Sequence, residues 1–169
     1  MMTDNIDEEL YPAIPILVFR LSEQCYALPL NCVHQIVDMV MITRLPDVPP
    51  PIQGAINVHG RLTVVIDVRQ RIGLPAKAYE AHTPLLLVEL AGRPVALAVD
   101  SVLGVREVAG ADLEVPDSFL PAGLTHRPRF ITSVGKSEGD LVLLLDPSQM
   151  LLADEEAPLD AALRTEPAV

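Results

Sequence analysis

Short apolar runs rich in β-branched residues alternate along the chain with turn-forming residues, which is the pattern of a chain built from short strands. The clearest example is the pair of runs at residues 52–58 and 62–66. The His59-Gly60-Arg61 segment between them predicts a hairpin, with Gly60 at the position that needs a positive φ. Apolar residues then recur at helical spacing, so Asp67 is expected to cap a short helix with its carboxylate.

The remaining runs extend the same pattern over most of the chain. Proline-rich segments at 40–51 and 110–129 predict loops, and residues 76–83 predict a linker. Gly139 is expected at the turn of a last hairpin, and Asp146 is expected to begin a closing helix at about 147–153. The other strands are expected at 14–21, 25–28, 33–37, 85–90, 94–99, 102–108, 131–136 and 141–145.

The chain contains an internal repeat, because the pattern of its first half returns in its second half. Chance matching of apolar runs is the alternative, but shared glycine and aspartate positions favour duplication. The matching segments are 17–21 with 86–90 and 26–33 with 95–102, at an offset of 69 residues, and 60–67 with 139–146, at an offset of 79.

The repeat predicts the architecture of the chain. Five short strands in each half are enough to curl into a small closed barrel, which leaves no exposed sheet edge. We therefore expect an all-β protein with a few short helices, in which two five-stranded lobes pack together. One domain is expected over 14–153, with lobe 1 at about 14–80, lobe 2 at about 84–146 and the closing helix after them.

The composition changes this picture only at the ends. The chain has a formal net charge of −11, and residues 1–13 and 154–169 hold nine acidic residues against one basic residue. These two segments are expected to be flexible acidic tails. A negative chain without a basic stripe disfavours nucleic acid as a partner. No apolar stretch is long enough for a transmembrane helix and the N-terminus has no secretory pattern, so we expect no direct membrane insertion.

A search for chemistry finds no pattern typical of an enzyme. The histidines lack metal-ligand spacing, no G-x-S-x-G motif occurs, and Gly135-Lys136-Ser137 lacks the glycine that a phosphate-binding loop needs. Asp67 and Asp146 occupy equivalent helix starts, which favours capping over an acid pair. We therefore expect no catalytic residue, no metal and no cofactor. The four histidines are His34, His59, His82 and His126.

Two polar sites remain that apolar burial does not explain. Asn57, His59 and Arg61 surround the tip of the 52–66 hairpin. Gln35 stands beside Ile36 in a β-branched run. A hydrophobic centre with a polar rim is typical of a modest protein interface. Ordinary solvated surface is the alternative, and composition does not separate the two.

The residues 54–69, which contain GAINVHG at 54–60 and VIDVR at 65–69, resemble the central motif of the CheW-like adaptor domain, approximately G-x-x-N-x-R-G-x-x-x-P-V-I-D-L-R. The resemblance extends over about residues 14–153. It implies two SH3-like β-barrels and a non-enzymatic, cytoplasmic coupler recruited to membrane-associated receptor clusters. The implied partners are the cytoplasmic tip of a chemoreceptor and the regulatory domain of a CheA-like histidine kinase.

Two positions depart from the family pattern. His59 stands where the family has arginine, and Gln35 stands where an acidic residue is usual, so the opposite-charge pair beside the receptor groove becomes two groups that can still hydrogen-bond. One alternative function is a kinase-docking regulator with altered receptor binding, in a pathway that controls surface motility, biofilm or a second messenger. Another is a small-molecule-binding double barrel. The expected partner-binding residues are Val33, Gln35, Ile36, Asn57, His59 and Gly60.

Overall fold

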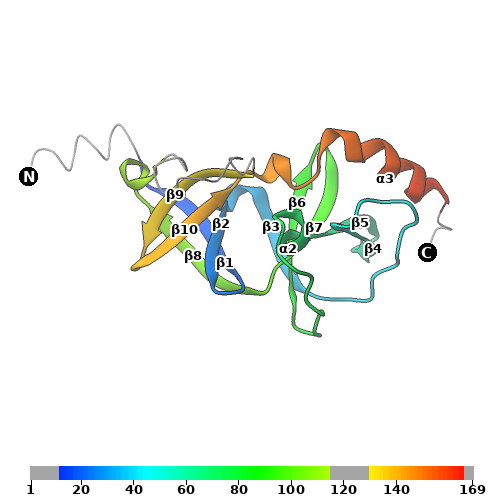
Figure 1. Cartoon of the computed structure of the whole chain (residues 1–169), viewed down its shortest axis with the longest axis horizontal. Coiled ribbons are helices and arrows are strands. Elements are labelled where there is room, and N and C mark those ends of the chain that lie inside the picture. Colours follow the sequence, from blue (N-terminus) through cyan, green and yellow to red (C-terminus); the bar gives the residue numbers. More distant parts are fainter. Residues whose placement is uncertain (1–11, 115–129, 166–169) are drawn as a thin grey trace, which may run out of the picture. The chain divides into compact units, whose positions relative to one another are not determined.

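The computed structural model describes residues 12–114 and 130–165 of the chain. Within these residues the protein is mostly β, with two five-stranded sheets and a few short helices (Figure 1), as the sequence predicts. The strands are β1 (Ile14–Leu21), β2 (Gln24–Pro29), β3 (Val33–Asp38), β4 (Ile52–Val58), β5 (Arg61–Asp67), β6 (Pro84–Leu90), β7 (Arg93–Ala98), β8 (Ser101–Val108), β9 (Ile131–Ser137) and β10 (Asp140–Leu145). The helices are α2 (Val68–Arg71) and α3 (Ala153–Thr165), with short 3₁₀ turns η1 (Leu30–Cys32), η2 (Gly110–Asp112) and η4 (Pro147–Gln149).

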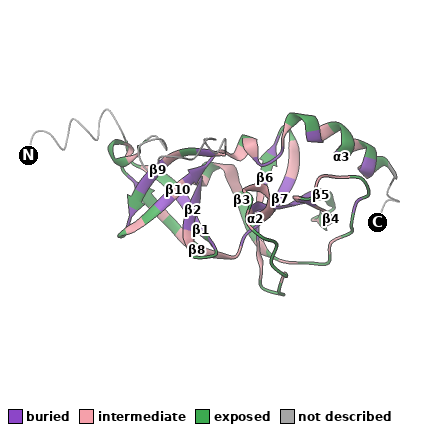
Figure 2. Cartoon of the chain, viewed as in Figure 1, coloured by how far each residue is buried: buried purple, intermediate pink, exposed green. Residues whose placement is uncertain are grey.

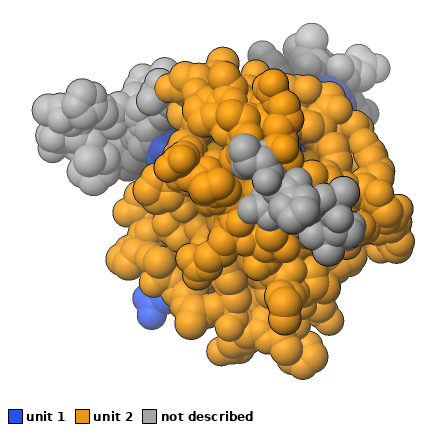
Figure 3. Space-filling model, turned by 90° about the vertical axis from the view of Figure 1, so that its right-hand side faces the viewer, with its two compact units in different colours: residues 1–32, 101–146 blue, residues 33–100, 147–169 orange. Residues whose placement is uncertain are grey.

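The chain divides into two compact units, which are coloured separately in Figure 3. Unit 1 comprises residues 1–32 and 101–146, and unit 2 comprises residues 33–100 and 147–169. The sheet of unit 1 has the strand order β8-β1-β2-β10-β9, and the sheet of unit 2 has the order β3-β6-β7-β5-β4. Each sheet has one parallel pair, β2 with β10 and β5 with β7, and its other pairs are antiparallel.

This division corrects the lobes expected from the sequence, which were contiguous at about 14–80 and 84–146. Each sheet instead combines the first two strands of one repeat with the last three strands of the other. Two repeats with the same apolar pattern present equivalent strand edges. The pattern therefore does not decide whether the first two strands of a repeat pair with the last three strands of the same repeat or of the other repeat. The exchange is therefore a property of the fold that the repeat alone does not reveal.

The duplication itself is visible in the strand pairing. In unit 2 the pairing of β3 with β6 skips His34, and in unit 1 the pairing of β8 with β1 skips Leu103. These two residues are related by the same offset of 69 that relates the repeats in the sequence. A bulge of one extra residue thus occurs at equivalent places in both sheets.

In each unit, the segment that follows one edge strand bridges to the other edge strand. In unit 1, Glu114, which follows β8, pairs with Val134 of β9, and in unit 2, Thr43, which follows β3, pairs with Ala55 of β4. A Cβ atom on Gly54 would collide with the carbonyl oxygen of Thr43, so the closure of unit 2 requires glycine there. The two sheets are therefore closed barrels rather than open sheets.

Each barrel has its own apolar core, and Figure 2 shows buried positions recurring along the strands of both units. Burying one such aliphatic side chain contributes roughly 1.5–3 kcal/mol to the free energy of folding. The core cluster of unit 1 contains Ile16, Val18, Cys25, Ala27, Val108, Val142 and Leu144, and that of unit 2 contains Ile56, Val65, Leu85, Ala96 and Ala98.

The predicted hairpin turns and the predicted cap at Asp67 are present. Gly60 and Gly139 have φ of +81° and +83°, and the residue before each is also left-handed, which is the type I′ geometry of a two-residue hairpin. Asp67 is the N-cap of α2, and its side chain accepts a hydrogen bond from the Gln70 backbone N–H at 3.4 Å. Asp146 precedes η4, and its role as a cap stays a prediction.

The C-terminal segment is a second correction. The sequence predicts a closing helix at about 147–153 and a flexible acidic tail from 154, whereas residues 147–149 form only the 3₁₀ turn η4, and helix α3 begins at Ala153 and ends at Thr165. Glu155, Leu159 and Ala162, spaced on one helix face, are buried, and Arg71 binds Glu155 at 2.7 Å. The acidic composition of this segment is also typical of a solvated tail. Here the charge of Glu155 is neutralised by Arg71, which is distant in the sequence. Residues 1–11 and 166–169 of the expected tails lie outside the described residues.

Candidate functional site

A groove of about 320 Å³ opens on unit 2, and residues from all five strands of its sheet line it. The edge strands β3 and β4 both contribute, which follows from the closure of the barrel. We call it the unit 2 groove. The lining residues are His34, Gln35, Val58, His59, Arg61, Thr63, Leu87, Val88, Glu89, Pro94 and Val95.

The bulge in β3 explains how one short strand gives two adjacent polar side chains to the groove. Gln35 pairs directly with Leu87 of β6, so their side chains lie on the same side of the sheet. His34 is the extra residue of the bulge and lines the groove as well. In a regular strand these two neighbours would point to opposite faces.

The turn between β4 and β5 supplies further polar groups to the groove. His59 occupies the left-handed first position of this turn, and Arg61 begins β5. The Asn57 side chain accepts a hydrogen bond from the Gly60 backbone N–H at 2.9 Å, which holds the turn in place. Asn57 and Gly60 thus shape the rim without lining the groove.

The expected binding residues divide into three groups. Gln35 and His59 line the groove together, and Asn57 and Gly60 shape its rim. Val33 is half-buried and Ile36 is exposed on β3, but neither belongs to the lining. The sequence analysis missed the groove residues on β6 and β7 because the strand exchange brings them there. The sequence analysis also missed His34, because His34 lines the groove as the extra residue of the β3 bulge and the sequence does not reveal that bulge.

The rim of the groove carries charged side chains, but the ion pair between them is weak. The Arg61 guanidinium lies 3.7 Å from the Glu89 carboxylate, with 63% and 46% of the two side chains exposed. A pair this exposed contributes between 0 and about 1 kcal/mol to stability. Leu87, Pro94 and Val95 supply the apolar surface beneath it. The groove therefore combines an apolar floor with polar groups that remain accessible to a partner.

A second hollow of unit 2, about 260 Å³, lies along the loop after β3. Its lining includes Met39, Val40, Ile42 and Tyr79, and the neighbouring Met41 is 93% exposed. Flexible methionine side chains adapt to varied apolar partners. Among the large hydrophobic residues that the structure describes, Met41 has the most exposed side chain.

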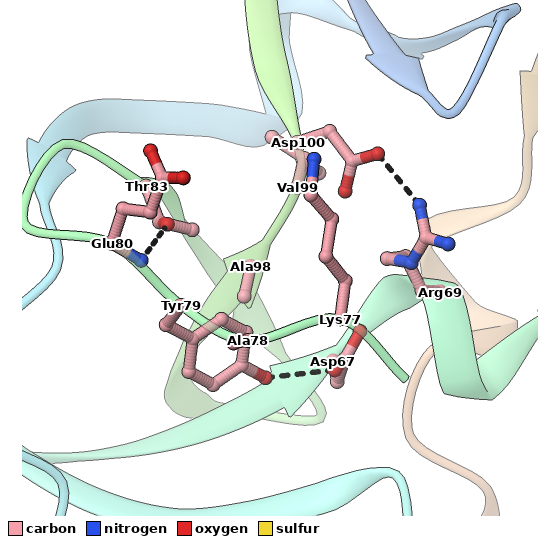
Figure 4. A pocket seen from close by; sticks show the side chains of 10 residues that line it. All are labelled: Asp67, Arg69, Lys77, Ala78, Tyr79, Glu80, Thr83, Ala98, Val99 and Asp100. Atoms are coloured by element: carbon pink, nitrogen blue, oxygen red, sulfur yellow. Dashed lines mark hydrogen bonds and ion pairs between the residues drawn. The ribbon is translucent and has the colours of Figure 1, made fainter. Parts of the chain in front are cut away.

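A third cavity is small, and several of the polar side chains that line it bond to one another (Figure 4). It holds about 40 Å³, lined by residues that include Asp67, Arg69, Tyr79 and Asp100. The Tyr79 hydroxyl donates to Asp67 at 2.8 Å, and Arg69 donates to Asp100 at 2.6 Å. Burial and the Asp67 carboxylate raise the pKa of Tyr79 well above its ordinary value. These groups satisfy one another, so this cavity is a structural element.

The described residues contain no group of three or more histidine, cysteine, aspartate or glutamate side chains placed to hold a metal ion. His34 and His59 share the unit 2 groove, His82 lies 3.8 Å from the Asp38 carboxylate, and His126 lies outside the described part of the chain. None of the helices in the described residues has the length and apolar character needed to span a bilayer.

Comparisons with known proteins agree on one family. A model of the CheW-like domain matches residues 15–155. Proteins named chemotaxis protein CheW are similar to this chain: the one from Klebsiella aerogenes is 24% identical over 144 residues, with 85% of each chain covered. The one from Bacillus subtilis is 29% identical over 147 residues, covering 86% of this chain and 90% of that protein.

A solved structure extends the likeness to the fold. The scaffolding protein TtCheW from Thermoanaerobacter tengcongensis matches with a TM-score of 0.74 at 27% sequence identity, covering 85% of this chain and 95% of that chain. The family match includes all ten strands and both barrels. The protein therefore belongs to the CheW-like domain family.

Proposed function

We propose that this protein is a non-enzymatic adaptor that couples the cytoplasmic tips of chemoreceptors to the regulatory domain of a CheA-type histidine kinase. The observation that carries the proposal is the family match across both barrels, residues 15–155. The adaptor works on the cytoplasmic side of the membrane and is recruited to receptor clusters. Its output is the chemotactic response for which its relatives are named.

The surface of unit 2 supports a role in which more than one partner is bound. An adaptor needs separate docking surfaces, because two partners must be held at the same time. The unit 2 groove has a polar rim, whereas the loop that carries Met41 exposes Val40 and Met41 and borders a separate hollow, which Arg44 and Gln53 also line. These surfaces differ in chemistry and share no lining residue.

Co-sedimentation tests the proposal directly. Receptor tips and a CheA-like kinase from the cell that encodes this protein would be assembled on vesicles, with and without the purified full chain. We expect the kinase to sediment with receptors only when the adaptor is added. Kinase recruitment that is unchanged by the adaptor, or an adaptor that binds neither protein, would contradict the proposal.

Two surface variants sharpen this experiment. Met41→Glu adds a charge to the apolar loop, and Arg61→Glu reverses the charge of the groove rim, and both positions are exposed. If the surfaces serve different partners, each variant reduces binding of one partner and leaves the other unchanged. Equal losses of both partners in both variants would argue against separate surfaces.

A further inference from the structure

The described methionines differ in how far their side chains are exposed. Met150 is fully buried, and Met39 is partly buried and packs against the core of unit 2. The Met41 side chain, in the loop between β3 and β4, is instead 93% exposed. Methionine is among the residue types most often buried in folded proteins, so this exposed position needs a structural account.

Hydrogen bonds on both sides of Met41 fix the backbone that carries it. Before Met41, the Met39 backbone N–H donates to the carbonyl that precedes β6 at 2.9 Å. After Met41, Thr43 exchanges two backbone hydrogen bonds with Ala55, at 2.9 and 2.8 Å. Met39 and Ile42 both pack against the core of unit 2. The loop is therefore attached to the barrel at both ends, and its fold holds the Met41 side chain in solvent.

The exposed thioether sulfur of Met41 is open to chemical modification. Peroxides oxidise methionine to the sulfoxide, which turns a flexible apolar side chain into a polar one. At Met41 the added oxygen stays in water, so the fold should not change. At Met150 the same oxygen would lie in the core, where a polar group without a hydrogen bond is costly.

The two cysteines are less accessible to an oxidant than Met41 is. Cys25 is buried, and Cys32 is partly exposed. Burial and the Asp146 carboxylate raise the pKa of the Cys32 thiol, which lowers the fraction of the reactive thiolate. Among the described residues, Met41 therefore has the most exposed side chain that contains sulfur.

Oxidation of Met41 would change the chemistry of the loop surface. Val40, which is 49% exposed, lies next to Met41 and lines the hollow of about 260 Å³. A sulfoxide oxygen adds a hydrogen-bond acceptor to this apolar surface. A partner that covers the surface must remove water from that acceptor, which lowers affinity unless the partner supplies a donor.

We propose that Met41 is a site of reversible oxidation to methionine sulfoxide by hydrogen peroxide or a related peroxide, and that the sulfoxide lowers recruitment of the kinase while the fold stays intact. The inference rests on the proposed function for this consequence. An adaptor that loses its hold on either partner no longer links the kinase to the receptors, so recruitment reports the loss whichever partner contacts the loop.

The reaction needs only the peroxide as co-reactant. The sulfur lone pair attacks one peroxide oxygen, and the O–O bond breaks. The proton of the transferred oxygen passes to the departing hydroxide, which leaves as water. Sulfur is oxidised and the peroxide is reduced, each by two electrons. Methionine sulfoxide reductases reverse the change, one enzyme for each sulfoxide epimer.

Peptide masses test the oxidation site. The full chain is treated with hydrogen peroxide, then with catalase and dithiothreitol, which reverses disulfide and sulfenic acid formation but not the sulfoxide. We expect oxidation of Met41 to be nearly complete while Met150 is unmodified and Met39 is oxidised more slowly. The urea denaturation midpoint should not change, and the two reductases should remove the added oxygen.

Co-sedimentation of the kinase with receptors tests the consequence, and each protein is compared with itself before and after oxidation. The unsubstituted chain should bind about tenfold more weakly after oxidation, and the reductases should restore its binding. Met41→Leu removes the oxidisable sulfur, so its binding should not respond to peroxide. Met39→Leu should still respond. Met41→Gln places an amide at this position, and should bind more weakly than Met41→Leu.

Four results would overturn the proposal. They are oxidation of Met39 or Met150 ahead of Met41, a lower urea midpoint after oxidation of Met41 alone, kinase recruitment that oxidation does not change, and a loss of recruitment in Met41→Leu equal to that of the unsubstituted chain. Recruitment that is strong but insensitive to oxidation would reject the inference and keep the proposed function. A reduced chain that recruits no kinase would reject the proposed function and this consequence, whereas the peptide masses and the urea midpoint would still decide the oxidation site.

Discussion

Unit 2 contains two sets of polar side chains that behave in opposite ways. The buried set comprises the Arg69–Asp100 pair, the Tyr79–Asp67 bond and the Arg71–Glu155 pair, with separations of 2.6 to 2.8 Å. The groove set comprises His34, Gln35, His59, Arg61 and Glu89, whose ion pair spans 3.7 Å and is mostly exposed. Asp67 and His59 belong to the same sequence motif, eight residues apart.

The difference separates structure from recognition. Buried polar groups are costly unless they are bonded, so the first set stabilises the unit by satisfying itself. Exposed groups that make weak internal contacts lose little when a partner replaces water. Substitutions should therefore affect stability in the first set and binding in the second.

The largest effect is expected from Arg71→Met. Arg71 binds Glu155 at 2.7 Å and donates to the Met150 carbonyl at 3.0 Å, and the Arg71 and Glu155 side chains are only 8% and 9% exposed. The substitution leaves a buried carboxylate without its cation, which costs about 3–5 kcal/mol in the free energy of unfolding. Urea denaturation measures the loss, and limited proteolysis within α3 should accelerate.

A double variant provides the control for that experiment. Arg71→Met combined with Glu155→Leu removes both charges and should recover much of the stability, because well-packed apolar pairs replace buried ion pairs without loss. An unchanged denaturation midpoint in Arg71→Met would show that the buried and groove sets do not differ.

A smaller loss is expected from Asp67→Ala. Asp67 caps α2 and accepts hydrogen bonds from the Gln70 backbone, the Gln70 side chain and the Tyr79 hydroxyl. Removing them and leaving the buried phenol without its acceptor should cost about 2–3 kcal/mol. Thermal and urea unfolding would show this, and Asp67→Asn should retain part of the cap. If Asp67→Ala abolished partner binding at full stability, Asp67 would belong to the recognition set.

Alkaline pH tests the Tyr79–Asp67 bond. Because the pKa of Tyr79 is raised in the folded protein, the unfolded chain loses this phenolic proton first, once the pH exceeds the ordinary value of 10.0. Rising pH therefore favours unfolding, by up to about 1.4 kcal/mol per pH unit for this group. Tyr79→Phe should make the decline of stability above pH 10 shallower. An identical decline in both proteins would contradict the assignment.

The smallest effect on stability is expected from Arg61→Gln. Its exposed pair with Glu89 contributes little, so the free energy of unfolding should change by less than about 0.5 kcal/mol. The same variant should reduce partner binding measurably. A stability loss comparable to that of Asp67→Ala would show that Arg61 contributes to stability as the buried set does, and would contradict the distinction between the two sets.

The sequence is sufficient for features that depend on neighbouring residues. The hairpin at Gly60, the cap at Asp67 and the strands follow from local backbone preferences and from apolar spacing, and all are present. The family resemblance led to Gln35 and His59, and the structure brings these two side chains to one groove.

The features that the sequence did not predict depend on contacts between distant segments. The strand exchange places β6 and β7 beside β3 to β5, which adds Leu87, Glu89 and Pro94 to the groove. The acidic C-terminal segment becomes helix α3 because Arg71 and Arg93 bind Glu155 and Asp160, at 2.7 Å in both cases. Neither arginine is near its partner in the sequence, so composition alone indicated a tail.

The exchange of strands between repeats has a consequence for the integrity of the chain. A cut in the linker between β5 and β6 would leave the first fragment with β1 and β2 of one barrel and β3 to β5 of the other. Neither fragment holds the five strands of a complete sheet, so each would stay open until the complementary fragment arrives. Co-expressed halves should therefore regain a native state only by association, and the intact polypeptide must form long-range pairings before either core is sealed, which slows its folding.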